Sequence, residues 1–165
     1  MTASSGWLPL DSTQTVDDLL TRFNEFHDGC LREMALATET YVDERRSMDV
    51  PGHLDTSALL YFQGQAKQLS AIEMRCEGIS HLKLRPTPEG DDSIIAYGTV
   101  QLDGDRCRLA VYFMGGPLTG PPNGWLAVKP SPPEDPDLEI IAQRMEWRPL
   151  PNTFGNTLRY RHEAG

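Results

Sequence analysis

The amino-acid sequence predicts an α+β fold, with one strongly curved, mostly antiparallel sheet of about six strands and an N-terminal helix packed on it. One early stretch has apolar residues at a helical period, and most of the later chain alternates apolar and polar residues as strands do. Asp103-Gly104-Asp105 joins two such alternating runs in the manner of a hairpin turn. A helix followed by hairpin-connected strands is typical of the α+β class.

The helix is expected after a loosely held N-terminal arm, residues 1–14. Thr15 is its predicted N-cap, and Asp17 and Asp18 follow in the first turn, where negative charge favours the helix dipole. Gly29, which can adopt the left-handed conformation, is predicted to stop the helix. The apolar side of the helix is formed by Val16, Leu19, Leu20, Phe23 and Phe26.

Strands are expected throughout the remainder of the chain. The alternating runs are 30–42, 58–65, 69–77 with a short continuation at 82–84, 93–102, 106–114 and 138–147. The polar stretch 43–55, which contains Pro51-Gly52, is predicted to be a loop. Residues 115–137 are rich in Gly and Pro and are predicted to leave the sheet as an excursion.

The domain organisation follows from these elements. Residues 15–151 are predicted to form a single α+β domain, which a chain of 165 residues can stabilise with one core. A polar C-terminal tail, 152–165, completes the chain.

Composition and charge exclude several classes of partner. The net charge is −9, so nucleic acid and anionic membrane surfaces would repel the protein, whereas a basic protein partner would not. The three cysteines, Cys30, Cys76 and Cys107, form no C-x-x-C pair, which is typical of reduced thiols in the cytosol. No export signal and no membrane-spanning apolar run is visible, so a cytoplasmic location is expected.

The segment Phe26-His27-Asp28-Gly29-Cys30-Leu31 joins the helix to the strands, and we call it the joint. His27 and Asp28 could act as a general base with its orienting carboxylate or as metal ligands. We favour a structural role, in which Asp28 accepts hydrogen bonds from backbone amides at the entry to the first strand.

Catalytic and metal-binding signatures are missing from the sequence. A zinc site would need His27 and Cys30 together with Cys76, Cys107 or His81, but these residues lack two close-spaced ligand pairs. No nucleophile elbow, phosphate-binding loop or dinucleotide motif occurs. No catalytic residue, metal or cofactor is therefore assigned, and a non-enzymatic role is favoured.

A candidate partner surface is formed by acidic loop residues and one tryptophan. If the loops gather at one end of the sheet, their carboxylates would lie beside an aromatic anchor suited to a basic protein. The simpler interpretation, which we favour, is that the acidic residues solubilise the loops. Trp125 would then pack inward as part of a lid. The surface comprises Trp125, Asp91, Asp92, Asp103, Asp105, Glu134 and Asp135.

Three short motifs give the chain a resemblance to a loose group of small bacterial α+β proteins. They are the joint, Ile72-Glu73-Met74-Arg75-Cys76-Glu77-Gly78-Ile79, and Met145-Glu146-Trp147, within residues 15–150. In that group a Phe-His-Asp motif precedes the first strand of an antiparallel sheet. Several members are classed as immunity proteins of polymorphic toxin systems, and others have no assigned role. The Gly/Pro-rich excursion has no counterpart in the group.

Two functional hypotheses follow. The first is a non-enzymatic cytoplasmic protein-binding domain, in its narrower form an immunity protein that neutralises a toxin. The alternative is a small-molecule-binding module or enzyme on a curved sheet, with a pocket near the joint lined by strand residues such as Tyr97 or Tyr112. The oligomeric state is left open.

Overall fold

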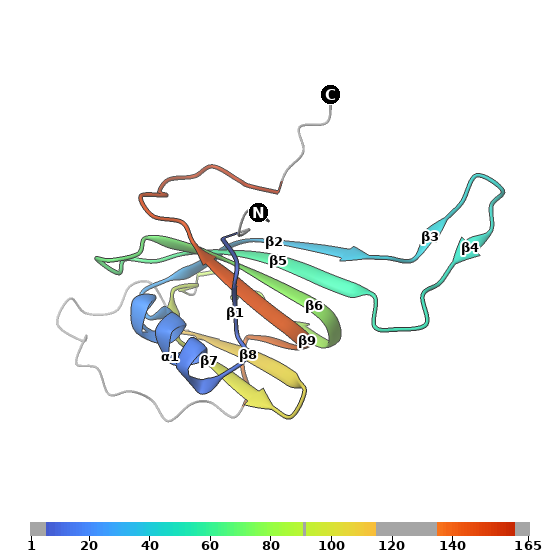
Figure 1. Cartoon of the computed structure of the whole chain (residues 1–165). Helices are drawn as coiled ribbons and strands as arrows, with labels where there is room; N and C mark the ends of the chain where they lie inside the picture. The colour runs from blue at the N-terminus through green and yellow to red at the C-terminus, as the bar shows by residue number, and fades with distance from the viewer. Residues whose placement is uncertain (1–5, 91, 115–134, 161–165) are drawn as a thin grey trace.

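The computed structural model describes residues 6–90, 92–114 and 135–160 (Figure 1). Its elements confirm the α+β prediction, with one antiparallel seven-stranded sheet, one α-helix and a separate two-stranded sheet. In chain order they are β1 (Leu8–Pro9), α1 (Thr13–Arg22), the 3₁₀ turn η1 (Asn24–Phe26), β2 (Cys30–Thr38), β3 (Tyr41–Val42), β4 (Met48–Asp49), β5 (Thr56–Gln63), β6 (Ala71–Leu84), β7 (Ile95–Asp103), β8 (Arg106–Phe113) and β9 (Leu138–Pro149).

The main sheet has the order β2-β5-β6-β9-β8-β7. The long strand β9 pairs with β6 along one side, from Leu84↔Leu138 to Ile72↔Pro149. Its other side is shared, because β8 pairs with the first half and β1 with the second. The last strand of the chain therefore lies in the middle of the sheet, where it connects the two hairpins β5–β6 and β7–β8.

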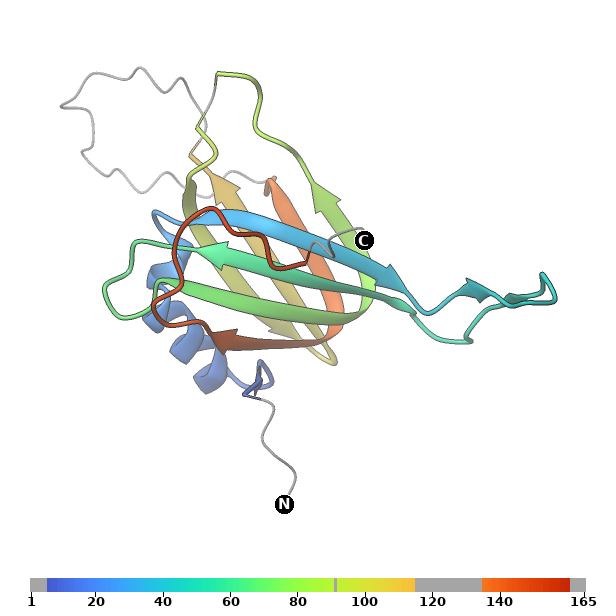
Figure 2. The same ribbon diagram turned by 90° about the horizontal axis from the view of Figure 1, so that it is seen from above.

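The two outermost strands of the sheet meet at one end. Gly29, directly before β2, forms an antiparallel bridge with Ile95 of β7. The Ile95 amide donates to the Gly29 carbonyl at 2.8 Å, and the Asp28 amide donates to the Ile95 carbonyl at 3.1 Å. In Figures 1 and 2, β7 and β8 consequently lie beneath β2 and β5, with α1 at one side of these two layers.

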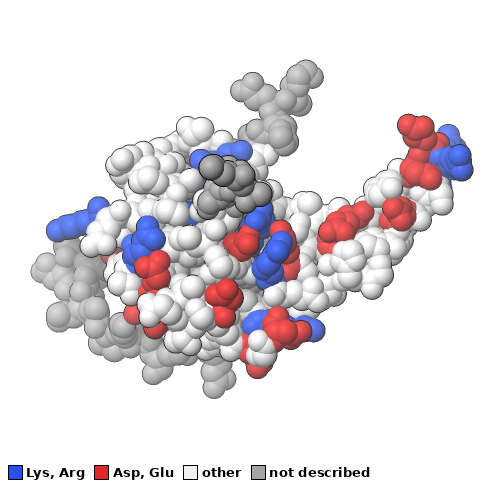
Figure 3. Space-filling model, in the orientation of Figure 1, with Lys and Arg blue, Asp and Glu red and all other residues white. Residues whose placement is uncertain are grey.

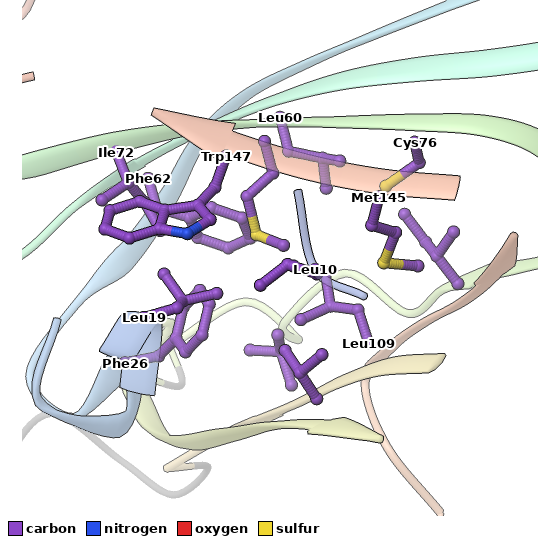
Figure 4. Close-up of a cluster of buried hydrophobic side chains, with 14 of the residues drawn as sticks. Leu10, Leu19, Phe26, Leu60, Phe62, Ile72, Cys76, Leu109, Met145 and Trp147 are labelled. Carbon is purple, nitrogen blue, oxygen red and sulfur yellow. The ribbon is translucent and has the colours of Figure 1, made fainter. Parts of the chain in front are cut away.

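The space between these layers is filled by apolar side chains from the helix and from both parts of the sheet (Figure 4). Leu19 and Phe26 point upward from the helical segment toward Phe62 and Trp147, while Leu109 approaches from β8. Phe26 makes edge-to-face contacts with Phe23 and Phe62, with ring centroids 5.3 and 5.1 Å apart. Such pairs contribute about 0.5–1.5 kcal/mol each beyond the burial of their area.

The helix begins and ends differently from the sequence prediction. Ser12, not Thr15, is the N-cap, and Thr15 completes a capping box by accepting the Ser12 backbone amide with its hydroxyl. Gly29 does not terminate the helix, which ends at Arg22. The left-handed residues that follow are Asn24, Glu25, Phe26 and Asp28, with φ between 50° and 64°. This reversal of the chain is what brings Phe26 into the core. A helix continued to residue 28 would not reverse here and would leave Phe26 outside the core.

The terminal segments are attached to the sheet more firmly than we predicted for a loosely held arm and a polar tail. Leu10 is buried and its amide donates to the Met145 carbonyl at 2.9 Å, while the guanidinium groups of Arg75 and Arg148 each lie within 5 Å of the centre of the Trp7 ring. At the other end, the Glu33 carboxylate accepts hydrogen bonds from the amides of residues 159 and 160.

The strand predictions agree with the structure at most positions. The Asp-Gly hairpin is confirmed, with Asp103 opposite Arg106 and Gly104 at φ +60°. The predicted continuation at 82–84 is strand as expected, but no break precedes it, because β6 is one 14-residue strand that runs through residues 78–81. A register shift between Ile79 and His81, next to Gly78 at φ +64°, interrupts the alternation that the sequence pattern relied on.

Gly98 provides a test of how the sheet closes on the helical segment. A Cβ atom at this position would lie 2.7 Å from Cδ2 of the Phe26 ring. Gly98→Ala should therefore lower the free energy of unfolding by about 1–3 kcal/mol, the usual cost of overpacking a core. Urea unfolding measures this, with Gly52→Ala as the matched control because its Cβ would meet nothing within 4 Å. Equal stability of the two variants would contradict the packing described here.

Candidate functional site

A hairpin that projects from the body of the protein is formed by residues 39–55, and we call it the hairpin arm (Figure 1). We predicted a loop for 43–55, but β4 pairs with β3, with Tyr41 opposite Asp49 and Val42 opposite Met48. The turn is well formed, because the Asp43 carboxylate accepts the amides of Arg45 and Ser47 at 2.9 and 2.8 Å. An Asp that caps its own turn in this way stabilises the hairpin locally.

The base of the hairpin arm is held by two polar contacts. The Thr40 hydroxyl donates to the Asp55 carboxylate at 2.6 Å, and this hydrogen bond holds the pKa of Asp55 below its usual value. Glu39 contacts the His53 ring at 2.9 Å. Both pairs connect the outgoing and returning chain, so they favour the projecting arrangement.

Exposed apolar side chains are concentrated on the hairpin arm. Of the ten large apolar residues that are exposed in the described part of the chain, five belong to it, namely Tyr41, Val42, Met48, Val50 and Leu54. Met48 is 64% exposed and Val42 59% exposed. Exposed apolar residues that stand singly are ordinary, but a group of them on one element makes that element a candidate interaction site. Sequence reasoning missed this site, although the apolar residues on both sides of the polar turn were a signal for a hairpin.

The outer face of the central strands differs from the hairpin arm, because its side chains are charged and form ion pairs between neighbouring strands. Three directly opposed pairs connect β6 with β9, namely Glu73–Arg148, Arg75–Glu146 and Glu77–Arg144. Glu73 is only 3% exposed and also lies 3.7 Å from Arg159 of the C-terminal segment. With its charges paired within the chain, this face has little unsatisfied binding capacity.

The joint places His27 and Asp28 in contact at the surface. Nδ1 of His27 lies 3.0 Å from Oδ2 of Asp28, and both side chains are close to half exposed. The carboxylate therefore contacts the imidazole, whereas we predicted that it would accept backbone amides. The bonds that anchor the joint come from the backbone of Asp28 and Gly29 to Ile95. A structural role for the His27 and Asp28 side chains therefore stays a prediction.

An open pocket of about 240 Å³ lies beside the joint. Its walls come from residues 28–30, the end of β5, Ser70 and the C-terminal residues 153–155. Tyr97 and Tyr112, which we expected in such a pocket, instead stack on each other across β7 and β8 at 4.6 Å between ring centroids. Burial raises the pKa of Tyr97.

The acidic residues predicted to form one partner surface are distributed over both ends of the sheet. Asp103 and Asp105 lie at the β7–β8 turn, whereas Asp92 lies at the opposite end of β7, where its carboxylate accepts the Ile94 amide at 2.7 Å. Asp135 is also at that opposite end, in ion pairs with Lys83 and Arg85 that lower its pKa. The remaining members, Asp91, Trp125 and Glu134, lie outside the described residues, as does most of the predicted excursion.

Metal-ligating side chains do not converge in the described part of the chain, where no group of three or more His, Cys, Asp or Glu residues could hold an ion. None of the helices built from those residues is long and apolar enough to cross a membrane.

The joint yields a prediction about Asp28, whose φ of +57° is tolerated by Asp better than by most residues. Asp28→Ala should lower the free energy of unfolding by about 1 kcal/mol, because alanine is strained in the left-handed region. Asp28→Gly should not, because glycine adopts this conformation freely. Thermal and urea unfolding compare the two variants. Equal losses in both would assign the effect to the carboxylate instead.

The cysteines should differ in reactivity. Burial raises the pKa of Cys107 to about 11 and raises the pKa of Cys76 even further, so both remain protonated thiols at pH 8. Cys30 is only partly buried. Iodoacetamide should therefore modify Cys30 first in the native protein and reach the other two only on unfolding, as peptide mass mapping would show. Early modification of Cys76 would contradict the packed core.

The comparisons with known proteins add no family to these observations, since no family model, no curated protein and no solved structure matches the chain.

Proposed function

We propose that this chain is a cytoplasmic protein-binding domain whose contact element is the hairpin arm. The observation that supports it best is the group of exposed apolar side chains on an element that projects from the body. Truncating or charging such residues typically removes binding energy while leaving a folded protein, because they contribute little to its own core.

The charge distribution supports the choice of the hairpin arm over the rest of the surface. On the outer face of β6 and β9, Glu73, Glu77 and Glu146 each form an ion pair with an arginine of the opposite strand, and acidic and basic groups lie side by side over the body of the protein (Figure 3). Charged groups along the hairpin arm are interrupted by uncharged surface, a combination that suits an interface with an apolar centre and a polar rim.

In its narrower form, the proposal is that the protein is an immunity protein and that its partner is a toxin with a basic surface. The resemblance of the joint and of residues 72–79 and 145–147 to the bacterial group supports this form. The net charge of −9 supports it too, because a basic partner would be steered toward the protein. Immunity genes lie directly downstream of toxin genes, so the product of the upstream gene is the partner to test first.

A second candidate function is small-molecule binding at the pocket beside the joint. Its support is that Asp28, whose carboxylate contacts the His27 ring, and Cys30 are among the residues that line this open pocket. Thr153→Trp should fill this pocket from the C-terminal side. A compound whose addition raises the melting temperature of the wild type but not of Thr153→Trp would favour this second function.

Substitution of Met48 tests the main proposal. Met48→Asp should change the free energy of unfolding by no more than about 0.5 kcal/mol, because the side chain is mostly exposed. Co-expression with the upstream gene product should show protection by the wild type and loss of protection by Met48→Asp. Protection that survives this substitution would remove the hairpin arm from the interface.

A photocrosslinking amino acid gives a second, direct measurement. Placed at Met48 in the living cell, it should form an adduct with a defined protein, whereas the same probe at Leu102 should not. Leu102 is the matched control because it is also exposed but lies at the β7–β8 turn. Identical adducts from both positions, or none from Met48, would overturn the proposal.

A further inference from the structure

The chain that follows β9 crosses the outer face of the sheet, and we call residues 151–160 the strap. In Figures 1 and 2 this red segment passes over β5 and β2. None of its residues, all of which the structure describes, is buried, and none belongs to a helix or strand. Phe154 is 71% exposed. Burial of apolar area in the strap therefore contributes little to its attachment.

Polar contacts hold the strap on the sheet instead. Near its start, the Thr153 amide donates to the Ser70 hydroxyl at 3.1 Å. Farther along, Arg32 donates to the Asn156 carbonyl at 2.8 Å. Hydrogen bonds of this kind can be exchanged for bonds to water or to another chain. The strap can therefore leave without uncovering the apolar core, which lies on the other face of the sheet.

Beneath the strap, opposed side chains form a row across the outer face. Glu33 of β2 is opposite Tyr61 of β5, and Tyr61 is opposite Glu73 of β6. Residues opposed in this way project to the same face of a sheet. The Tyr61 ring therefore lies between two carboxylates, and we call these three residues the acidic row. Tyr61 is only 1% exposed and Glu73 only 3% exposed.

One arginine of the strap occupies the acidic row. The backbone amides of Arg159 and Tyr160 donate to the Glu33 carboxylate. The Arg159 guanidinium lies 5.5 Å from the centre of the Tyr61 ring and 3.7 Å from the Glu73 carboxylate. The acidic row thus offers an aromatic face and a carboxylate to a guanidinium, and a second carboxylate to the backbone that carries it.

The strap does not satisfy every group in this contact. The 3.7 Å between Arg159 and Glu73 is too long for a hydrogen bond. The Tyr160 hydroxyl is buried and has no hydrogen-bond partner among the residues that the structure describes. A buried polar group without a partner costs free energy. An arginine-bearing segment that bonds Glu73 directly and buries no unpaired hydroxyl would therefore fit the acidic row better than the strap does.

We propose that the acidic row is a receptor for an arginine-bearing segment of the partner protein, and that the strap covers it until this segment takes its place. The inference rests on the proposed function, because it takes the partner to be a basic protein and names what part of it binds beside the hairpin arm. Strand β2 carries Glu33 and leads directly into the hairpin arm, so both contacts lie along one stretch of chain. Glu73 keeps its ion pair with Arg148 when the strap leaves.

The experiment first releases the strap in the full chain by one charge reversal. Arg159→Glu places a carboxylate against the acidic row, so the strap should detach. Because residues 153–155 line the pocket beside Cys30, iodoacetamide should then modify Cys30 faster than in the wild type. Arg45→Glu is the matched control, since it makes the same charge change at an exposed residue of the hairpin arm and should leave the rate unchanged.

A fluorescent synthetic peptide of residues 152–160 then measures binding to the acidic row by fluorescence anisotropy. It should bind Arg159→Glu about tenfold more tightly than the wild type, or better, because in the wild type the tethered strap competes at a high effective concentration. The same peptide with Arg159→Glu should bind neither protein. Adding Glu33→Gln to the Arg159→Glu protein should weaken binding of the unmodified peptide, as should added salt.

Each outcome decides the question. If Arg159→Glu is folded by circular dichroism but binds the peptide no better than the wild type, or leaves the Cys30 rate unchanged, the receptor is overturned. If Arg159→Glu does not fold, Arg159→Gln takes its place under the same criteria. Peptide binding without a crosslink from Met48 would keep the receptor and remove the hairpin arm as the contact element. A Met48 crosslink without peptide binding would remove the receptor alone.

Discussion

The packing of Phe26 against Gly98 is the interaction on which the arrangement of the helix and the two ends of the sheet depends. Gly98 has no side chain, and only for that reason can the Phe26 ring approach β7 closely enough to reach the core. The same segment then passes directly into the Gly29–Ile95 bridge. One aromatic side chain and one backbone bridge thus connect the helix, the first long strand and the far edge of the sheet.

This arrangement requires an unfavourable backbone. Asn24, Glu25 and Phe26 are consecutive left-handed residues, and this conformation costs Glu25 and Phe26 roughly 1–2 kcal/mol each, whereas asparagine tolerates it better. Complete burial of a phenylalanine and its two edge-to-face contacts are the local gains that oppose this cost. The turn is therefore stabilised through its contacts with the sheet, with Phe62 of β5 and with Gly98 of β7.

The sequence could predict those features that depend on local chemistry. The Asp103–Asp105 turn, the alternation of the long strands and the apolar side of the helix all follow from neighbouring residues. It could not predict the early end of the helix, since Phe26 continues the helical period and only tertiary packing reverses the chain there. The sequence also could not place the acidic loops relative to one another. Strand β9 returns between β6 and β8, and this long-range pairing puts Asp103 and Asp135 at opposite ends of the sheet.

The hairpin arm was hidden from sequence reasoning for a different physical reason. Its apolar residues are few and are separated by Asp, Glu and Arg, so the segment has the composition of a solvated loop. Only the pairing of Tyr41–Val42 with Met48–Asp49 shows that the apolar side chains stand together on an ordered element. The hairpin arm is ordered although it has no core of its own. The hydrogen bond from the Arg45 amide to Asp43 and the Thr40–Asp55 hydrogen bond hold its backbone, whereas its apolar side chains stay exposed and gain no burial energy. Burial of those side chains against another protein surface would release free energy that one chain does not gain by itself, and this is the physical basis of the proposed role of the hairpin arm.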